Sequence, residues 1–586
     1  MSQGTGTGTA SATGGSGDAE TPSVDPTSGG AETSAATTGR GSGDHVIELP
    51  ALDNVNDGRF ATSQSCIGCH TADASSEAMR DEAGRDVSPY GLWQASMMAN
   101  AARDPYWWAM VRAEGAATPS KALEIEGECT RCHAPVAAVR PELWDDTPMS
   151  LGGLLADTDR GQLGLDGVGC SACHKIGDDD ILGESQWSGH IDLREEPQMM
   201  GPHADPFPMP MSMHTGFEPV QAAHFDSSAV CAGCHTLDTQ TLTPEGEPAG
   251  GHFSEQSPYL EWLNSGYSTE VADPGPQARS CQDCHMPSQS EDGVPISTRI
   301  ARRPSGGDFP PVSERSPYNR HTFLGGNTLV PAMLRDHADT LRPVASSDAF
   351  DELIAQTLDQ LGNRTATVAL TAPSRTGDTL EVTARIENLT GHKFPSGFPS
   401  RRAWLEVVVT DADGDPVFHS GGVDAQGRLL DGEGAVLATE MVGAATQPHF
   451  DLIDTDSDVQ IWQTVMAGVE GDPVFRLLRA DSDFKDNRIL PDGWRNDSPF
   501  MDRIAPELGG ADDDFVGGRD DVTYRFTAPA DAGPYTVEAR LLYQPLSARF
   551  AAELFVLDAP EIRAFEAMWD AADRTPAVVA TAQAEG

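Results

Sequence analysis

All ten cysteines of this 586-residue chain fall into five copies of one pattern, a C-x-x-C-H pentapeptide. In a helical turn, residues three and four apart share a face, so two thiols can form thioether bonds to one haem while the histidine reaches its iron. C-x-x-C-H is accordingly the attachment signature of haem c. We predict five covalently bound haem c groups, with the cysteines as attachment points and the histidines as proximal iron ligands, in the motifs Cys66-Ile-Gly-Cys69-His70, Cys129-Thr-Arg-Cys132-His133, Cys170-Ser-Ala-Cys173-His174, Cys231-Ala-Gly-Cys234-His235 and Cys281-Gln-Asp-Cys284-His285.

Structural zinc is the main alternative, because cysteine pairs with two residues between them also build zinc ribbons. A ribbon takes two such pairs for each metal ion, and five pairs leave one over. Disulfides would not require a histidine after every second cysteine. A thioredoxin-like redox motif is expected once rather than five times. The pattern therefore favours haem and leaves zinc as the alternative.

The stretch that carries the motifs is poor in apolar residues. Leu, Ile, Val and Phe make up roughly 15% of residues 60–345, below the ~20% that marks chains able to build their own core. Either this stretch is disordered or something other than side chains fills its interior. Five haems, each a large apolar group, would supply that interior.

A six-coordinate iron needs a second axial ligand, and eleven histidines lie outside the motifs. Most histidines are surface or hydrogen-bonded residues, so context has to select among them. A methionine thioether can also ligate haem iron. The candidates with the most suggestive settings are Met98, His190, His203, His214, His224, His321 and His392.

Several segments resemble multihaem cytochromes c, in particular those related to cytochrome c554 and the hydroxylamine oxidoreductase group. They are the five motifs, the Cys281–Pro287 ending, the Tyr259–Trp262 segment and the Thr390–Trp404 run. The resemblance covers roughly residues 60–500. It implies closely spaced haems, mostly with two histidine ligands, and a Trp-x-x-Ser-x-His element after the first motif. That element here reads Trp93-Gln-Ala-Ser-Met-Met98, with methionine in place of histidine.

From these settings and the resemblance, we expect the distal ligands to be Met98, His214, His224, His321 and His392, with His203 and His190 as reserves. If His392 ligates a haem, the region around it must pack against the haem-binding region. Which ligand serves which haem stays open at this point.

The sequence predicts a multidomain α+β protein. Residues 1–45 read as a disordered low-complexity tail, residues 46–345 as a mostly helical, loop-rich pentahaem domain, residues 346–560 as an antiparallel β-sandwich-like domain, and residues 561–586 as a C-terminal helix and tail. The turn Asp411–Asp415 carries several carboxylates but lacks the glutamate of a calcium loop, so it is read as a hairpin turn.

The formal net charge of −51 argues against a nucleic-acid binder, because the chain offers little basic surface to neutralise phosphates. It predicts redox partners that dock through a basic face. The expected function is electron transfer along a short series of haems, with no catalytic residue assigned. The alternative is a haem-dependent oxidoreductase that acts on a small nitrogen or sulfur compound at one open iron.

Haem attachment is normally completed outside the cytoplasmic membrane, so we expect a periplasmic, outer-membrane-attached or extracellular protein. No export signal is recognisable near Met1. An export segment or a lipid anchor upstream of the given start is therefore expected. The sequence leaves the oligomeric state open.

Overall fold

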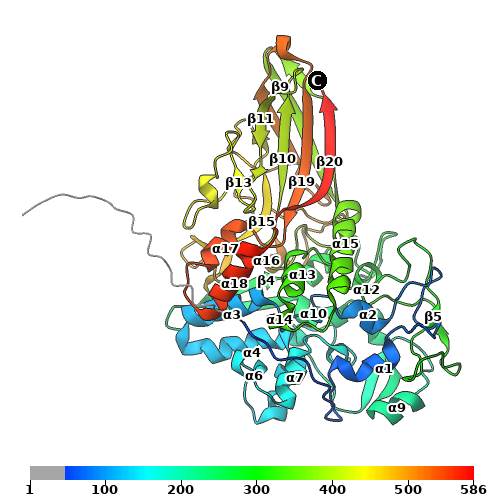
Figure 1. Cartoon of the computed structure of the whole chain (residues 1–586). Coiled ribbons are helices and arrows are strands. Elements are labelled where there is room, and N and C mark those ends of the chain that lie inside the picture. Colours follow the sequence, from blue (N-terminus) through cyan, green and yellow to red (C-terminus); the bar gives the residue numbers. More distant parts are fainter. Residues whose placement is uncertain (1–46) are drawn as a thin grey trace, which may run out of the picture. The chain divides into compact units, whose positions relative to one another are not determined.

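A computed structural model describes residues 47–586 of the chain (Figure 1). The predicted tail, residues 1–45, lies outside the described residues. The α-helices are α1 (Ile67–His70), α2 (Pro89–Trp93), α3 (Pro105–Ala117), α4 (Ala122–His133), α5 (Pro135–Ala138), α6 (Leu151–Leu154), α7 (Asp159–Leu165), α8 (Cys170–Cys173), α9 (Met209–Thr215), α10 (Ala229–His235), α11 (Pro258–Leu263), α12 (Cys281–His285), α13 (Leu329–Asp336), α14 (Ala338–Leu341), α15 (Ser347–Arg364), α16 (Met501–Ile504), α17 (Ala548–Leu554) and α18 (Pro560–Ala571).

The strands are concentrated after residue 365. They are β1 (Gln198–Gly201), β2 (Glu218–Gln221), β3 (Leu237–Leu242), β4 (Pro248–Gln256), β5 (Thr298–Arg299), β6 (Glu314–Arg315), β7 (Ala366–Leu370), β8 (Ser374–Thr376), β9 (Thr379–Asn388), β10 (Arg402–Thr410), β11 (Pro416–Ser420), β12 (Gly422–Val423), β13 (Leu429–Leu430), β14 (Leu452–Ile453), β15 (Ile461–Ala467), β16 (Pro473–Val474), β17 (Ser482–Asp486), β18 (Arg519–Thr527), β19 (Thr536–Gln544) and β20 (Ala577–Glu585). Helices with long loops before residue 346 and strands after it agree with the predicted α+β class.

Two sheets form the C-terminal half. A seven-stranded sheet runs in the order β16-β15-β10-β19-β20, with β11 on β10 and β17 on β15; a five-stranded sheet runs β14-β18-β9-β7, with β8 on β9. Figure 1 shows β10, β19 and β20 side by side. Alternate residues of β9 and β10 enter one hydrophobic core shared by both sheets, as the period-two pattern of these segments predicts.

Two details differ from the expected antiparallel sandwich with a C-terminal tail. The short strand β14 pairs with β18 in parallel. Residues 577–585, which the sequence suggested as a tail, form β20 and pair antiparallel with β19. Alanine dominates β20 and gives it a weak intrinsic strand preference, so its pairing with β19 determines its conformation.

The helical region shares a core with the C-terminal helices. Trp108 of α3, Phe350 of α15 and Phe565 of α18 belong to one buried cluster, and α18 packs on α3. Helix α15 begins after Ser346, whose hydroxyl accepts a hydrogen bond from the backbone N–H of Ala349. The described residues, 47–586, consequently form one compact unit. Within the described residues, no helix has the length and apolar character needed to cross a membrane.

Candidate haem-binding site

Each C-x-x-C-H motif lies in a short helix or at the end of a longer one. The second motif forms the last turn of α4 and the fourth the last turn of α10, while the other three lie on α1, α8 and α12. In α12 a capping box fixes the start of the helix, because Ser280 and Asp283 bond each other's backbone N–H groups. The helical turn expected at the motifs is therefore present in the protein.

All five motifs line one cavity of about 2490 Å³. A site for a single small ligand occupies about 300–1,000 Å³. The cavity therefore has room for several large groups. It also accounts for the low apolar content of residues 60–345, because this region is folded around an open interior that its own side chains do not fill.

Four of the five motif histidines are held by backbone carbonyls. The Nδ1–H groups donate to Ile300 O at 2.9 Å from His70, to Ala101 O at 2.9 Å from His133, to Met200 O at 2.5 Å from His174 and to Leu324 O at 2.6 Å from His285. A carbonyl only accepts, so each of these nitrogens must carry the proton. The lone pair then lies on Nε2, the arrangement found in metal-bound histidines.

Burial keeps these imidazoles neutral. It lowers the pKa of His133 and of His235 to about 4, and it also lowers the pKa values of His70, His174 and His285. A neutral imidazole can ligate a metal, whereas an imidazolium cannot.

Two of the expected distal histidines lie opposite motif histidines. The ring centres of His174 and His321 are 6.5 Å apart, and those of His285 and His392 are 6.4 Å apart. A metal ion bonded to two imidazole nitrogens at about 2.0–2.1 Å each holds the ring centres about 6 Å apart. Both pairs therefore have the spacing that an iron between them requires.

The segment around His321 connects two motifs. The backbone N–H of Phe323 donates to the carbonyl of His285 at 2.9 Å, and the Leu324 carbonyl receives the His285 Nδ1–H. His321, two residues earlier, faces His174 of the third motif. One stretch of chain thus orients the fifth motif histidine and supplies a partner to the third.

The loop that carries His392 is fixed by buried charges. Lys393 forms an ion pair with Asp486 at 2.5 Å, and both side chains are at most 2% exposed. Arg488 bridges Asp486 and Glu261 of α11, at 2.7 and 2.8 Å. Glu261 also accepts hydrogen bonds from the Lys393 backbone N–H and the Ser396 hydroxyl. These contacts link the C-terminal half to α11 beside the fourth and fifth motifs.

Gly391 permits this close approach. A Cβ at this position would lie 3.1 Å from Trp262 Cδ1 and 3.2 Å from Tyr267 Cβ. Any larger residue would push the His392 loop away from α11.

The remaining expected ligands divide into two groups. Met98 and His214 line the cavity, as do the reserves His190 and His203. His224 does not line it, and its Nε2 lies 2.9 Å from the carbonyl of Ile176. The structure thus places the His224 Nε2 against a backbone carbonyl and not toward the cavity. Among residues 47–586, no second imidazole faces His70, His133 or His235 as His321 and His392 face their partners.

Two further residues of the site were not anticipated. Trp107 stacks on the ring of His133, with ring centres 4.6 Å apart and planes within 9°. Glu255 is buried near the second motif, and burial raises its pKa to about 8. A single tryptophan or glutamate carries no sequence pattern that would predict such a role. The carbonyls that hold the histidines cannot be predicted either, because every residue has a backbone carbonyl.

Cysteines of different motifs contact one another. The Cys66 and Cys170 thiols are in hydrogen-bonding contact, and so are Cys132 with Cys234 and Cys231 with Cys281. The electrostatic influence of Cys173 also reaches Cys231 and Cys234. The fourth motif therefore neighbours the second, third and fifth, and the first neighbours the third.

The side-chain placement bears on the zinc alternative. Within residues 47–586, the groups of three or more acidic, histidine or cysteine side chains close enough to share a metal contain no cysteine. A zinc ribbon needs four such ligands around one ion. The donor set fits haem c instead, because each motif offers two free thiols and one histidine at the same cavity wall.

In comparisons with known proteins, no protein family matches this chain and no curated protein sequence matches it. Among solved structures, the crystal structure of a penta-heme cytochrome c552 from Thermochromatium tepidum is similar to it, with 17% sequence identity and a TM-score of 0.45. The match covers 90% of this chain and 99% of that chain. A similarity this weak establishes neither function nor cofactor, so the haem sites rest on the residues described above.

Proposed function

We propose that the protein is a pentahaem c-type cytochrome that passes electrons between redox partners. Bound haem c would supply the one-electron chemistry, with a potential set by axial ligands, burial and nearby charge. The observation that carries the proposal is the common cavity, where five pairs of free thiols lie beside neutral histidines and two of these histidines face a second imidazole.

The contacts between motifs support transfer rather than five isolated sites. The sulfur contacts join the first motif to the third and the second and fifth to the fourth. Attachment points that touch keep the attached groups close, as a series of electron carriers requires. The fourth motif is the point at which this series branches.

The charge of the protein favours docking of a basic partner. The net charge is −51, so a steered partner would present a basic face. Cys284 is exposed, which brings the fifth motif to the surface where a partner can exchange electrons. We place this activity in the periplasm or outside the cell, where haem c is normally attached.

Spectroscopy of single variants tests the proposed ligands. In His321→Ala or His392→Ala, one haem should lose an axial ligand and change from low spin to high spin, as measured by electron paramagnetic resonance. His224→Ala is the matched control, because the His224 Nε2 hydrogen-bonds to the Ile176 carbonyl and His224 itself does not line the cavity. Its spectrum should equal that of the unmodified protein. Unchanged low-spin signals in both ligand variants would contradict the assignment.

The unmodified protein gives a second result in the same experiment. Five low-spin haems would support a carrier. A high-spin haem that binds a small nitrogen or sulfur compound would instead favour the oxidoreductase alternative.

A further inference from the structure

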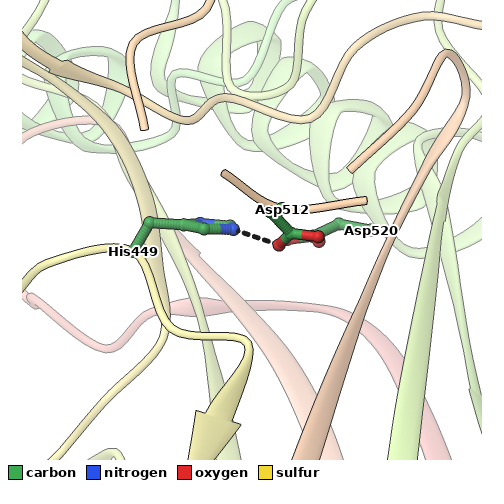
Figure 2. A group of neighbouring side chains, drawn as sticks. All are labelled: His449, Asp512 and Asp520. Atoms are coloured by element: carbon green, nitrogen blue, oxygen red, sulfur yellow. Dashed lines mark hydrogen bonds and ion pairs between the residues drawn. The ribbon is translucent and has the colours of Figure 1, made fainter. Parts of the chain in front are cut away.

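His449 meets two aspartates from a distant part of the sequence, Asp512 and Asp520, at one end of the two-sheet region (Figure 2). His449 lies in the loop before β14, Asp512 in the loop before β18, and Asp520 on β18 itself. Their potential ligand atoms all lie within 4.8 Å of one another. His449 and Asp512 side chains are 4% and 3% exposed, and Asp520 is fully buried.

The charge of the buried Lys485 reaches Asp520 electrostatically but does not pair with either carboxylate. Within the described residues, neither Asp512 nor Asp520 forms an ion pair with a lysine or an arginine. The nearby Lys485 Nζ donates instead to the carbonyls of Gln447, Pro448 and Ile461. Burying carboxylates close together without a compensating charge is costly, so the site requires a cation or a shared proton.

One carboxylate oxygen has no partner at all. Oδ2 of Asp520 accepts a hydrogen bond from Trp462 Nε1 at 2.6 Å, but its Oδ1 is buried and unbonded. Figure 2 shows the Asp520 carboxylate directed at Asp512. A buried carboxylate oxygen that accepts no hydrogen bond and lies beside a second carboxylate is available to bind a cation.

His449 is not available as a metal ligand. Its Nδ1 lies 2.8 Å from Gln460 Nε2 and 3.0 Å from Asn487 Nδ2, which are both donors. Exchanging the oxygen and nitrogen of either side-chain amide would break another hydrogen bond. Gln460 Oε1 accepts from the Phe450 N–H, and Asn487 Nδ2 donates to the Ile461 carbonyl. Nδ1 therefore accepts, and the ring proton is on Nε2, which donates to Asp512 at 2.7 Å. This histidine orients Asp512.

Two more acidic groups adjoin Asp512 on the loop side. Carboxylate oxygens of Asp451 and Asp514 lie within 4.8 Å of a carboxylate oxygen of Asp512, and Oδ1 of Asp514 is also buried without a partner. Asp512 therefore belongs to two close groups, one with Asp520 and one with Asp451 and Asp514, which adds negative charge beside the Asp512–Asp520 pair.

We propose that Asp512 and Asp520 bind a calcium ion, with waters as further oxygen donors and His449 as the residue that positions Asp512. Calcium prefers six to eight oxygen ligands and accepts waters among them, which suits carboxylates drawn from separate loops. Zinc favours nitrogen and sulfur ligands, but the His449 Nε2, which faces the carboxylates, carries a proton. The ion would join the loops before β14 and β18 to the sheet, away from the haem cavity.

Metal analysis of the full-length, haem-loaded protein tests this proposal. After removal of bound metal with a chelator and dialysis against calcium, we expect a single calcium ion per chain and a higher unfolding temperature in calcium than in chelator or magnesium. Asp520→Asn keeps the shape and the Trp462 hydrogen bond but removes a charged ligand, so calcium should bind at least about tenfold more weakly. Asp513→Asn is the matched control, because Asp513 lies in the same loop but is exposed.

Three results would overturn the proposal. The first is an unfolding temperature of the unmodified protein that does not respond to calcium, which needs no variant and would indicate that the carboxylates share a proton. The second is calcium binding by Asp520→Asn equal to that of Asp513→Asn. The third is zinc binding that is tighter than calcium binding and is abolished in His449→Gln, which would make His449 a ligand.

Discussion

Replacing both cysteines of the fourth motif, Cys231→Ala with Cys234→Ala, is expected to divide the series of redox sites into separate groups. The variant should retain four of five haems, so its pyridine haemochrome absorbance per chain should fall by a fifth. The fourth motif contacts the second and fifth through cysteine thiols and neighbours the third. We therefore expect stopped-flow reduction of the remaining haems to become slower and to separate into several phases.

The first motif provides the matched control. Cys66→Ala with Cys69→Ala should also remove one haem, but the first motif neighbours the third, through Cys66 and Cys170, and is not the branch point. The other four sites stay connected, so reduction should keep the kinetics of the unmodified protein. Equal kinetics in the two double variants would contradict the branched arrangement, and a full set of haems in either would contradict the attachment sites.

The second large effect is expected at the buried charges that hold the His392 loop. Burial acts to raise the pKa of Asp486, but the Arg488 and Lys393 charges outweigh it and hold that pKa well below its usual range. Asp486→Ala would leave Lys393 unpaired in the interior and Arg488 with Glu261 as its remaining partner. Breaking a buried pair in this way costs about 3–5 kcal/mol of unfolding free energy. Chemical denaturation followed by circular dichroism measures this loss.

An exposed ion pair in the same half provides the comparison. Arg525 and Glu381 are 2.7 Å apart and both 42% exposed, so Glu381→Ala should cost at most about 1 kcal/mol. Asp486→Ala should also change the signal of one haem, since Lys393 follows His392 directly. Equal stability of the two variants would show that the buried cluster does not fix the loop.

Local patterns in the sequence were sufficient for much of the fold. Residues 346–560 were predicted as an antiparallel sandwich-like domain, because strands such as β9 and β10 show an apolar face in period two. Strand β20 was missed, since an alanine-rich segment acquires its conformation from pairing with β19. Helix α15 was also missed, because it lies at the start of the range predicted as a β-sandwich-like domain.

The candidate site also has a part that the sequence predicted and a part that it could not predict. The motifs carry their chemistry in five consecutive residues, so the thiols and motif histidines were evident. The expected partners His321 and His392 lie opposite motif histidines, whereas the Nε2 of His224 meets a carbonyl. That carbonyl belongs to Ile176, and the identity of a residue does not predict where its backbone carbonyl will lie.

Carboxylates show the limit of short-range patterns most clearly. Asp411–Asp415, considered as a calcium loop and read as a hairpin turn, does close a turn between β10 and β11, with the Asp411 N–H bonded to the Asp415 carbonyl. The group that does gather buried carboxylates combines Asp512 with Asp520 and His449. These residues meet only because the loops before β14 and β18 end beside each other.

Most of the few lysines lie in the interior. The chain has four lysines. Three of them, Lys175, Lys393 and Lys485, are buried and bonded to carbonyls or a carboxylate. Lysine is thus retained mainly at structural positions in the interior.

Peptide mass spectrometry of protein produced in a host able to attach haem c tests the central claim most directly. We predict that each of the five C-x-x-C-H peptides carries the added mass of one haem and that none of the ten cysteines reacts with a thiol reagent. Peptides of unmodified mass with freely reactive cysteines, from a host that attaches haem to a control cytochrome, would contradict it.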